Sequence, residues 1–99
     1  MIPGVIQITS KFTDKNVHRL EVLRDKIIPA CVNAVGASNY ILVSPENSRL
    51  QELVESLGAT FVLYTGWEKD KSRKFREGTA IADQEWVAFL DDDILPDLE

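Results

Sequence analysis

Apolar residues in this chain follow two alternating patterns. Short continuous runs, rich in β-branched and aromatic residues, predict buried strands. They cover residues 5–10, 40–43, 60–64 and 86–90. Between them, apolar residues recur every three or four positions, which predicts amphipathic helices. These segments cover residues 17–35, 44–57 and 71–83. Strands and helices are therefore expected to alternate along the chain.

The absence of hairpin signals predicts parallel strands. We expect an α/β fold, with a Rossmann-like open parallel sheet of about four strands and helices on both faces. Right-handed crossovers bring the loops that follow the strands to one edge of the sheet. With 99 residues in all, residues 1–99 are expected to form a single small domain.

Prolines and glycines predict where the helices begin and end. Pro29 lacks a backbone donor, so the first helix should kink or break there. Ser44 followed by Pro45 predicts a helix start, with Ser44 as the N-cap and Pro45 at the first helical position. Gly36 and Gly58 are natural stops for the first two helices. Small residues at 78 and 82 predict that the last helix lies close to the sheet.

Negative charge is concentrated at the end of the sequence. The chain has 16 acidic residues, 11 basic residues and a net charge of −5. Five of the acids lie after residue 90: Asp91, Asp92, Asp93, Asp97 and Glu99. The first ninety residues therefore carry 11 acids, which balance the 11 bases. This distribution argues against a nucleic-acid partner and favours a local cation-binding corner.

Cys31 is the only cysteine, which excludes an internal disulfide and a Cys/His zinc site and fits a reducing compartment. The sequence shows no run of eighteen apolar residues and no signal-peptide pattern. We therefore expect a cytoplasmic protein without a membrane span.

The apolar run at 86–90 ends abruptly in Asp91, Asp92 and Asp93. Hard cations such as Mg²⁺ or Mn²⁺ prefer carboxylate oxygens, and in nucleotide enzymes such a metal bridges the substrate phosphates. In an extended chain, Asp91 and Asp93 point to one side and Asp92 to the other. We therefore predict a metal site at Asp91 and Asp93. A solvated acidic turn before Pro96 is the alternative interpretation.

Basic residues gather just before this strand. Five of the eleven lie within eight positions: Lys69, Lys71, Arg73, Lys74 and Arg76. A pyrophosphate needs such countercharge, and arginine offers a bidentate fork. Arg73 or Arg76 is therefore a candidate phosphate ligand. An ordinary solvated helix face, paired with neighbouring acids, accounts for most of the five equally well.

Further candidates follow the first two strands. The hydroxyls of Thr9 and Ser10 are placed to contact a base or ribose, or to cap a turn. Glu46 lies near a helix N-terminus, where either a ligand or simple capping explains it. The chain has no Gly-x-Gly-x-x-Gly, no P-loop and no Ser/His/Asp set, which argues against dinucleotide-binding, P-loop and nucleophilic-hydrolase classes.

Residues 74–97 resemble the nucleotide-sugar-dependent glycosyltransferases of the GT-A fold, especially the family-two group. That family has a glycine, a short helix ending in Ala, and then Gly-Glu-Trp-hydrophobic-x-Phe-Leu-Asp-x-Asp with a later proline. The matching residues here are Gly78, Ala82, the run Glu85-Trp86-Val87-Ala88-Phe89-Leu90-Asp91-Asp92-Asp93, and Pro96. The resemblance implies the N-terminal, nucleotide-binding half of a GT-A fold.

Site roles follow from the resemblance residue by residue. Asp91 and Asp93 would be the Asp-x-Asp aspartates that meet Mg²⁺ or Mn²⁺ on the sugar-nucleotide diphosphate, with Asp92 replacing one of them if the register shifts. Thr9 would contact the base, and Arg73 or Arg76 the base or phosphate. The chain departs from the family at two places. It has Ser44-Pro45-Glu46-Asn47 where Asp-Asp-Gly-Ser is common, and Phe75 where an arginine is usual.

The resemblance covers nearly the whole chain but about half of such an enzyme. It implies a partial glycosyltransferase domain that binds a nucleotide-diphosphate sugar without completing sugar transfer by itself. The alternative is a non-catalytic α/β module that forms a homodimer or docks a partner through its sheet edge, because an unpaired edge strand readily pairs with another chain.

Overall fold

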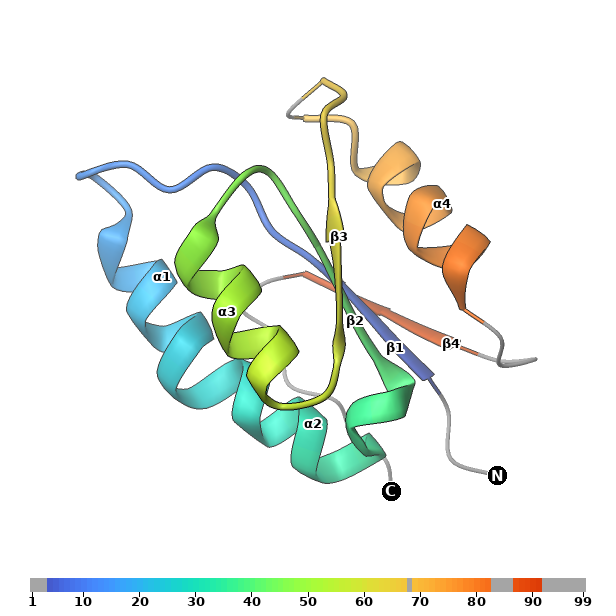
Figure 1. Cartoon of the computed structure of the whole chain (residues 1–99). Coiled ribbons are helices and arrows are strands. Elements are labelled where there is room, and N and C mark those ends of the chain that lie inside the picture. The colour runs from blue at the N-terminus through green and yellow to red at the C-terminus, as the bar shows by residue number, and fades with distance from the viewer. Residues whose placement is uncertain (1–3, 68, 83–86, 92–99) are drawn as a thin grey trace.

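A parallel sheet of four strands forms the centre of the molecule, in the order β3-β2-β1-β4 (Figure 1). The computed structural model describes residues 4–67, 69–82 and 87–91. The strands are β1 (Gly4–Ile8), β2 (Tyr40–Ser44), β3 (Thr60–Leu63) and β4 (Val87–Leu90). This arrangement confirms the predicted α/β fold with a Rossmann-like open sheet.

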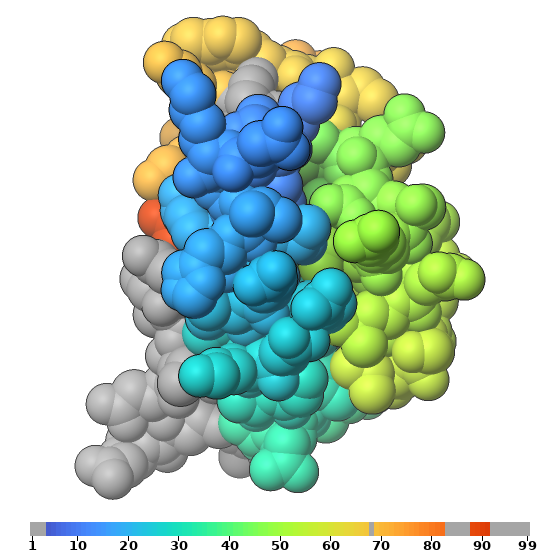
Figure 2. Space-filling model, turned by 90° about the vertical axis from the view of Figure 1, so that its left-hand side faces the viewer, coloured from blue at the N-terminus to red at the C-terminus, as the bar shows by residue number. Residues whose placement is uncertain are grey.

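Helices cover both faces of the sheet, as predicted. One face carries α1 (Val17–Val22), α2 (Ile28–Val35) and α3 (Ser48–Ser56), and α4 (Lys71–Ile81) lies on the other (Figure 1). Figure 2 shows α1 and α2, coloured blue to cyan, beside the green α3. A short 3₁₀ turn, η2 (Ala37–Asn39), leads into β2. No helix in the described ranges is long and apolar enough to span a membrane.

Strand side chains alternate between the two faces and build two hydrophobic clusters. Val5 and Leu42 pack against α1, α2 and α3, together with buried helix residues such as Leu23 and Leu50. The cluster on the α4 side contains Ile6, Ile8, Ile41, Val43 and Tyr64. Every residue of β1 and β2 is buried, so these two strands form the interior of the sheet.

The first long helix changes its hydrogen-bonding pattern just before Pro29. A π-helical turn, η1 (Leu23–Ile27), separates α1 from α2, and Pro29 lies in the first turn of α2. Proline cannot donate the backbone bond that a continuous α-helix needs, and a π turn is one way to accommodate that loss. The backbone stays helical at Ile27 and Ile28, so the predicted interruption at Pro29 is found as a change of hydrogen-bonding pattern and not as an end of the helix. Gly36 and Gly58 follow α2 and α3 with φ of 89° and 82°, which suits their predicted role as helix stops.

The predicted start of α3 at Ser44 is wrong. Ser44 stays in β2, where its carbonyl accepts the amide of Tyr64 at 2.8 Å, and its hydroxyl donates to the Pro45 carbonyl at 2.8 Å. The N-cap is Asn47, whose Oδ1 accepts the amide of Leu50 at 3.2 Å. Pairing with the neighbouring strand keeps Ser44 extended, and asparagine caps a helix as well as serine does.

Gly78 lets α4 lie close to the sheet, as predicted. A Cβ atom at this position would lie 2.6 Å from Cγ2 of Ile6 and 3.2 Å from Cγ2 of Val43. Both neighbours are fully buried in the two interior strands, so they have little room to shift. The missing side chain therefore sets how close α4 comes to β1 and β2.

We predict that Gly78→Ala destabilises the fold. In an open helix the change gains about 1 kcal/mol, but overpacking against a buried strand costs about 1–3 kcal/mol. A net loss of up to about 2 kcal/mol is expected in urea unfolding. The matched control is Ser72→Ala, an exposed position of α4, which should leave stability unchanged or slightly higher. A gain in stability for Gly78→Ala would contradict the close packing.

Candidate functional site

The carboxyl ends of β1 and β4 lie at the switch point of the sheet. From β1 the chain moves outward to β2 and β3, then crosses to the other side of β1 to form β4. In open α/β sheets, ligands bind outside the carboxyl ends of the strands where the strand order reverses. Thr9 and Asp91 directly follow these two strands, so they flank the expected binding position.

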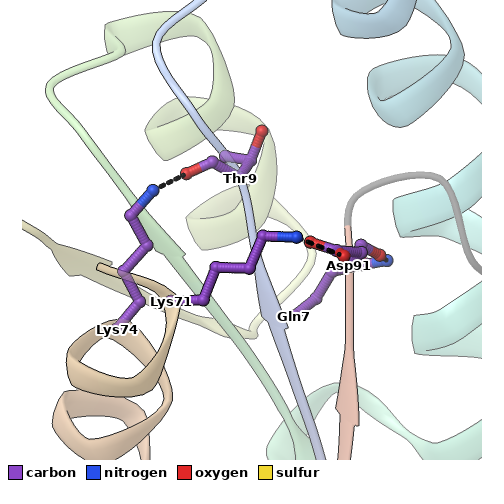
Figure 3. Close-up of polar contacts among 5 residues, drawn as sticks. All are labelled: Gln7, Thr9, Lys71, Lys74 and Asp91. Carbon is purple, nitrogen blue, oxygen red and sulfur yellow. Dashed lines mark hydrogen bonds and ion pairs between the residues drawn. The ribbon is translucent and has the colours of Figure 1, made fainter. Parts of the chain in front are cut away.

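Asp91 is linked to α4 by an ion pair. Nζ of Lys71 lies 3.0 Å from Oδ2 of Asp91 (Figure 3). The side chains are 65% and 40% exposed, respectively. Exposed pairs of this kind contribute little to stability. The carboxylate of Asp91 is therefore accessible and only loosely held by its counter-ion.

Lys74 is a buried cation at the same edge. It is 1% exposed, and its Nζ donates to the carbonyl oxygen of Thr9 at 3.2 Å (Figure 3). The same Nζ lies 5.4 Å from the ring centroid of Tyr64, within cation–π range. Lys74 thus fastens the first turns of α4 to the end of β1.

Gln7 is a buried amide inside the apolar β1. Its Nε2 donates to the carbonyl oxygen of Asp91 at 2.8 Å, as Figure 3 shows. Its Oε1 accepts the hydroxyl of Tyr40 at 2.6 Å, and Sγ of Cys31 lies 3.7 Å away. The end of β4 is therefore connected to β2 and α2 through one side chain.

Burial keeps the two donors of this network neutral. Desolvation raises the pKa of the Cys31 thiol from its ordinary 9.0 to about 11. Desolvation, with a smaller contribution from Cys31, raises the pKa of the Tyr40 hydroxyl well above its ordinary value. Cys31 is therefore an inert core thiol and not a nucleophile.

The candidate residues after β1 and β2, Thr9, Ser10 and Glu46, differ in solvent exposure. Thr9 is buried, and its Oγ1 lies 3.5 Å from the carbonyl oxygen of Ser10. Ser10 and Glu46 are exposed in the loops that follow β1 and β2. Only the latter two present their side chains freely to a ligand at this edge.

The two predicted arginines have other surroundings than the lysines. Nε of Arg73 lies 4.0 Å from Oε1 of Glu77, and Arg76 is exposed. The side-chain contacts that reach the strand ends come from Lys71 and Lys74. Lys74 lies one helical turn before Gly78, the small residue that faces the sheet. This spacing places both residues on the same helix face, so the sequence could have predicted that Lys74 is buried. Gln7 could have been identified as a candidate because it is a single polar residue within the apolar run of β1.

Of the two predicted metal ligands, the structure describes Asp91. Asp92 and Asp93 lie outside the described residues. Within residues 4–67, 69–82 and 87–91, no three His, Cys, Asp or Glu side chains lie close enough to hold a metal ion. Asp91 is thus the predicted metal ligand whose position can be described.

The loop after β3 presents an exposed tryptophan. Trp67 is 69% exposed, and its carbonyl accepts the hydroxyl of Tyr64 at 2.8 Å. A Cβ atom at Gly66 would collide with the Tyr64 ring, so the loop needs glycine there. The loop backbone is held in place while the indole faces solvent.

Replacing Lys74 should destabilise the fold much more than replacing Lys71. We predict that Lys74→Ala lowers the free energy of unfolding by about 2–3 kcal/mol, because it removes a packed stem and a charge-assisted hydrogen bond. Lys71→Ala should cost less than about 1 kcal/mol. Lys74→Met, which keeps the stem, separates the two contributions. Equal losses for both alanine variants in urea unfolding would contradict the buried role of Lys74.

Stability should fall in alkaline solution. Since the folded pKa of Cys31 exceeds its ordinary value, the neutral thiol stabilises the fold fully below about pH 9, and this contribution is lost as the pH rises through about 11. The expected loss is about 2–3 kcal/mol. Unfolding curves measured across this range should show a flatter pH profile for Cys31→Ala. An unchanged profile would show that the thiol titrates normally.

The chain matches none of the protein-family models, curated proteins or solved structures with which it was compared. The residues at the carboxyl ends of β1 and β4, above all Asp91, therefore provide the evidence for a function.

Proposed function

We propose that the chain is the donor-binding part of a GT-A-like glycosyltransferase domain, which binds a nucleotide-diphosphate sugar through Mg²⁺ or Mn²⁺ at Asp91 and Asp93. The observation that carries this proposal is the position of Asp91, at the carboxyl end of β4 and beside β1. This is the switch point, where open α/β sheets bind their ligands. In the run that resembles the family, the apolar residues end and the aspartates begin at this position.

The ion pair at Asp91 supports exchange with a metal. The carboxylate is 40% exposed and is held by an exposed ammonium on a flexible stem. A divalent cation would attract the carboxylate more strongly than Lys71 does, and Lys71 would then be available to pair with phosphate oxygens. Lys71, which pairs with Asp91 in the free protein, would pair with a diphosphate in the complex.

Charge and hydroxyls at the same edge support the nucleotide part of the proposal. Lys71 lies in the first turn of α4, where backbone amides and the helix dipole also favour anions. We assign Arg73 or Arg76 to the outer phosphate oxygens. Ser10 and Glu46, exposed after β1 and β2, are assigned to the ribose or base. The proposal concerns donor binding, because the acceptor site of such enzymes belongs to their second half.

A second candidate function is self-association through the sheet edges. The outer strands each expose a large apolar side chain: Leu63 on β3 is 52% exposed and Phe89 on β4 is 51% exposed. Phe89 keeps this exposure although its ring centroid lies 4.9 Å from that of Phe75. Edge strands with exposed apolar residues tend to pair with other chains.

Calorimetric titration with UDP and with GDP, each in the presence of Mn²⁺, tests donor binding. The parent chain should bind at least one of them, and a chelator should abolish the binding. Asp91→Asn should weaken binding by at least about tenfold, and Asp91→Ala/Asp93→Ala should remove it. The matched control is Glu52→Gln, an exposed position of α3, which should bind like the parent. No binding by the parent would refute the proposal.

Light scattering separates the two candidates. A donor-binding domain should respond to metal and nucleotide through Asp91. A tight dimer that ignores both, and that dissociates on Phe89→Asp or Leu63→Asp, would favour the self-associating module instead.

A further inference from the structure

We propose that Gln7 is a positioning residue for Asp91, and that it fixes the main chain from which the candidate metal ligand projects. The consequence for ligand binding rests on the proposed function. The effect on the structure of Asp91 does not, so the two can be tested separately.

Gln7 lies where an amide side chain is energetically unfavourable. It is fully buried in an interior strand of the sheet, and burying an amide is unfavourable unless its polar atoms are bonded. Its bonds reach Asp91, 84 positions later in the chain, and Tyr40 on the neighbouring strand. An apolar residue would fill the same space without this cost, so the amide is best explained by the bonds that it makes.

The bond from Gln7 extends the β1–β4 pairing by one residue. The register of the two strands ends at Gln7 opposite Leu90. Asp91 lies just beyond this last pair, and the side-chain Nε2 of Gln7 donates to its carbonyl oxygen at 2.8 Å. β4 pairs with β1 alone among the described strands. The amide therefore continues the support of the main chain where the strand ladder stops.

Asp91 is held from both faces of the sheet. Gln7 alternates with Ile6 and Ile8 along β1, so its side chain lies on the face that carries α1, α2 and α3. Lys71 approaches from α4 on the other face. The exposed ion pair to Lys71 is weak and exchangeable, whereas the bond from Gln7 is partly buried and its donor side chain is fully buried. The bond from Gln7 would remain if a metal ion displaced Lys71.

The orientation of the amide is set by its partners. Tyr40 and Cys31 both place hydrogen-bond donors beside Oε1, and burial keeps both protonated. The oxygen of the amide must therefore face them, which leaves the NH₂ group to face the carbonyl of Asp91. Tyr40 and Cys31 each orient Gln7, so Cys31 still orients the amide when the Tyr40 hydroxyl is removed, and Gln7 holds Asp91.

The test compares Gln7→Leu with Tyr40→Phe. Gln7→Leu removes the bond to Asp91 together with the bonds from Tyr40 and Cys31, whereas Tyr40→Phe removes only the bond between Tyr40 and Gln7. Each should lower the melting temperature by several degrees, on the order of 4–8 °C. By ¹⁵N relaxation, the order parameter of the Asp91 amide should fall in Gln7→Leu and stay at the parent value in Tyr40→Phe.

Binding of UDP with Mn²⁺ should weaken by about tenfold or more in Gln7→Leu and by less than about twofold in Tyr40→Phe. Equal weakening in both variants, or none in Gln7→Leu, would overturn the positioning role while the proposed function stands. If the parent does not bind, the proposed function fails, and the order parameter of Asp91 alone decides the role of Gln7.

A measurement on the parent chain covers the case in which Gln7→Leu does not fold. A scalar coupling across the hydrogen bond, between Nε2 of Gln7 and the carbonyl carbon of Asp91, should be detectable by NMR. Its presence supports the bond that the role requires. Its absence would overturn the proposal.

Discussion

The burial of β1 on both faces and both edges is the constraint on which this structure depends. Its five residues are all buried, and it pairs with β2 on one side and β4 on the other. Ile6 meets α4 at Gly78, and Gln7 reaches past the end of β4. A strand in this position cannot slip without exchanging its two faces, because side chains alternate. The register of β1 therefore determines where Thr9 and Asp91 emerge.

The order of the elements was predictable because each strand is a bounded apolar run and each helix carries its own periodicity. Those are local properties, and they place Thr9 and Asp91 at one edge once the strands are taken as parallel. The cap of α3 was missed by a few residues. Ser44 and Asn47 are both good caps, and the choice between them is made by pairing with β3, which is a tertiary effect.

The polar residues that organise the edge were harder to predict, because their partners lie far away in the chain. Lys74 bonds to a carbonyl 65 positions earlier, and Gln7 to one 84 positions later. In the local sequence, only its spacing of one helical turn from Gly78 distinguishes Lys74 from Arg73. Burial separates them: Lys74 is nearly inaccessible, whereas Arg73 is exposed. The cluster of basic residues in the sequence indicated that α4 contributes to this edge of the sheet, but it did not indicate which of these residues is buried.

The contact between Lys74 and Thr9 also affects how this sequence can diverge. An ammonium on a slender stem fits a site with one carbonyl and one aromatic face, whereas a guanidinium brings five donors that need partners. Substitution by arginine, harmless on the exposed positions of α4, is therefore disfavoured at this one. Among related chains, basic residues on the outer face of the helix are free to drift, while a lysine at position 74 should persist as long as the helix stays fastened to β1.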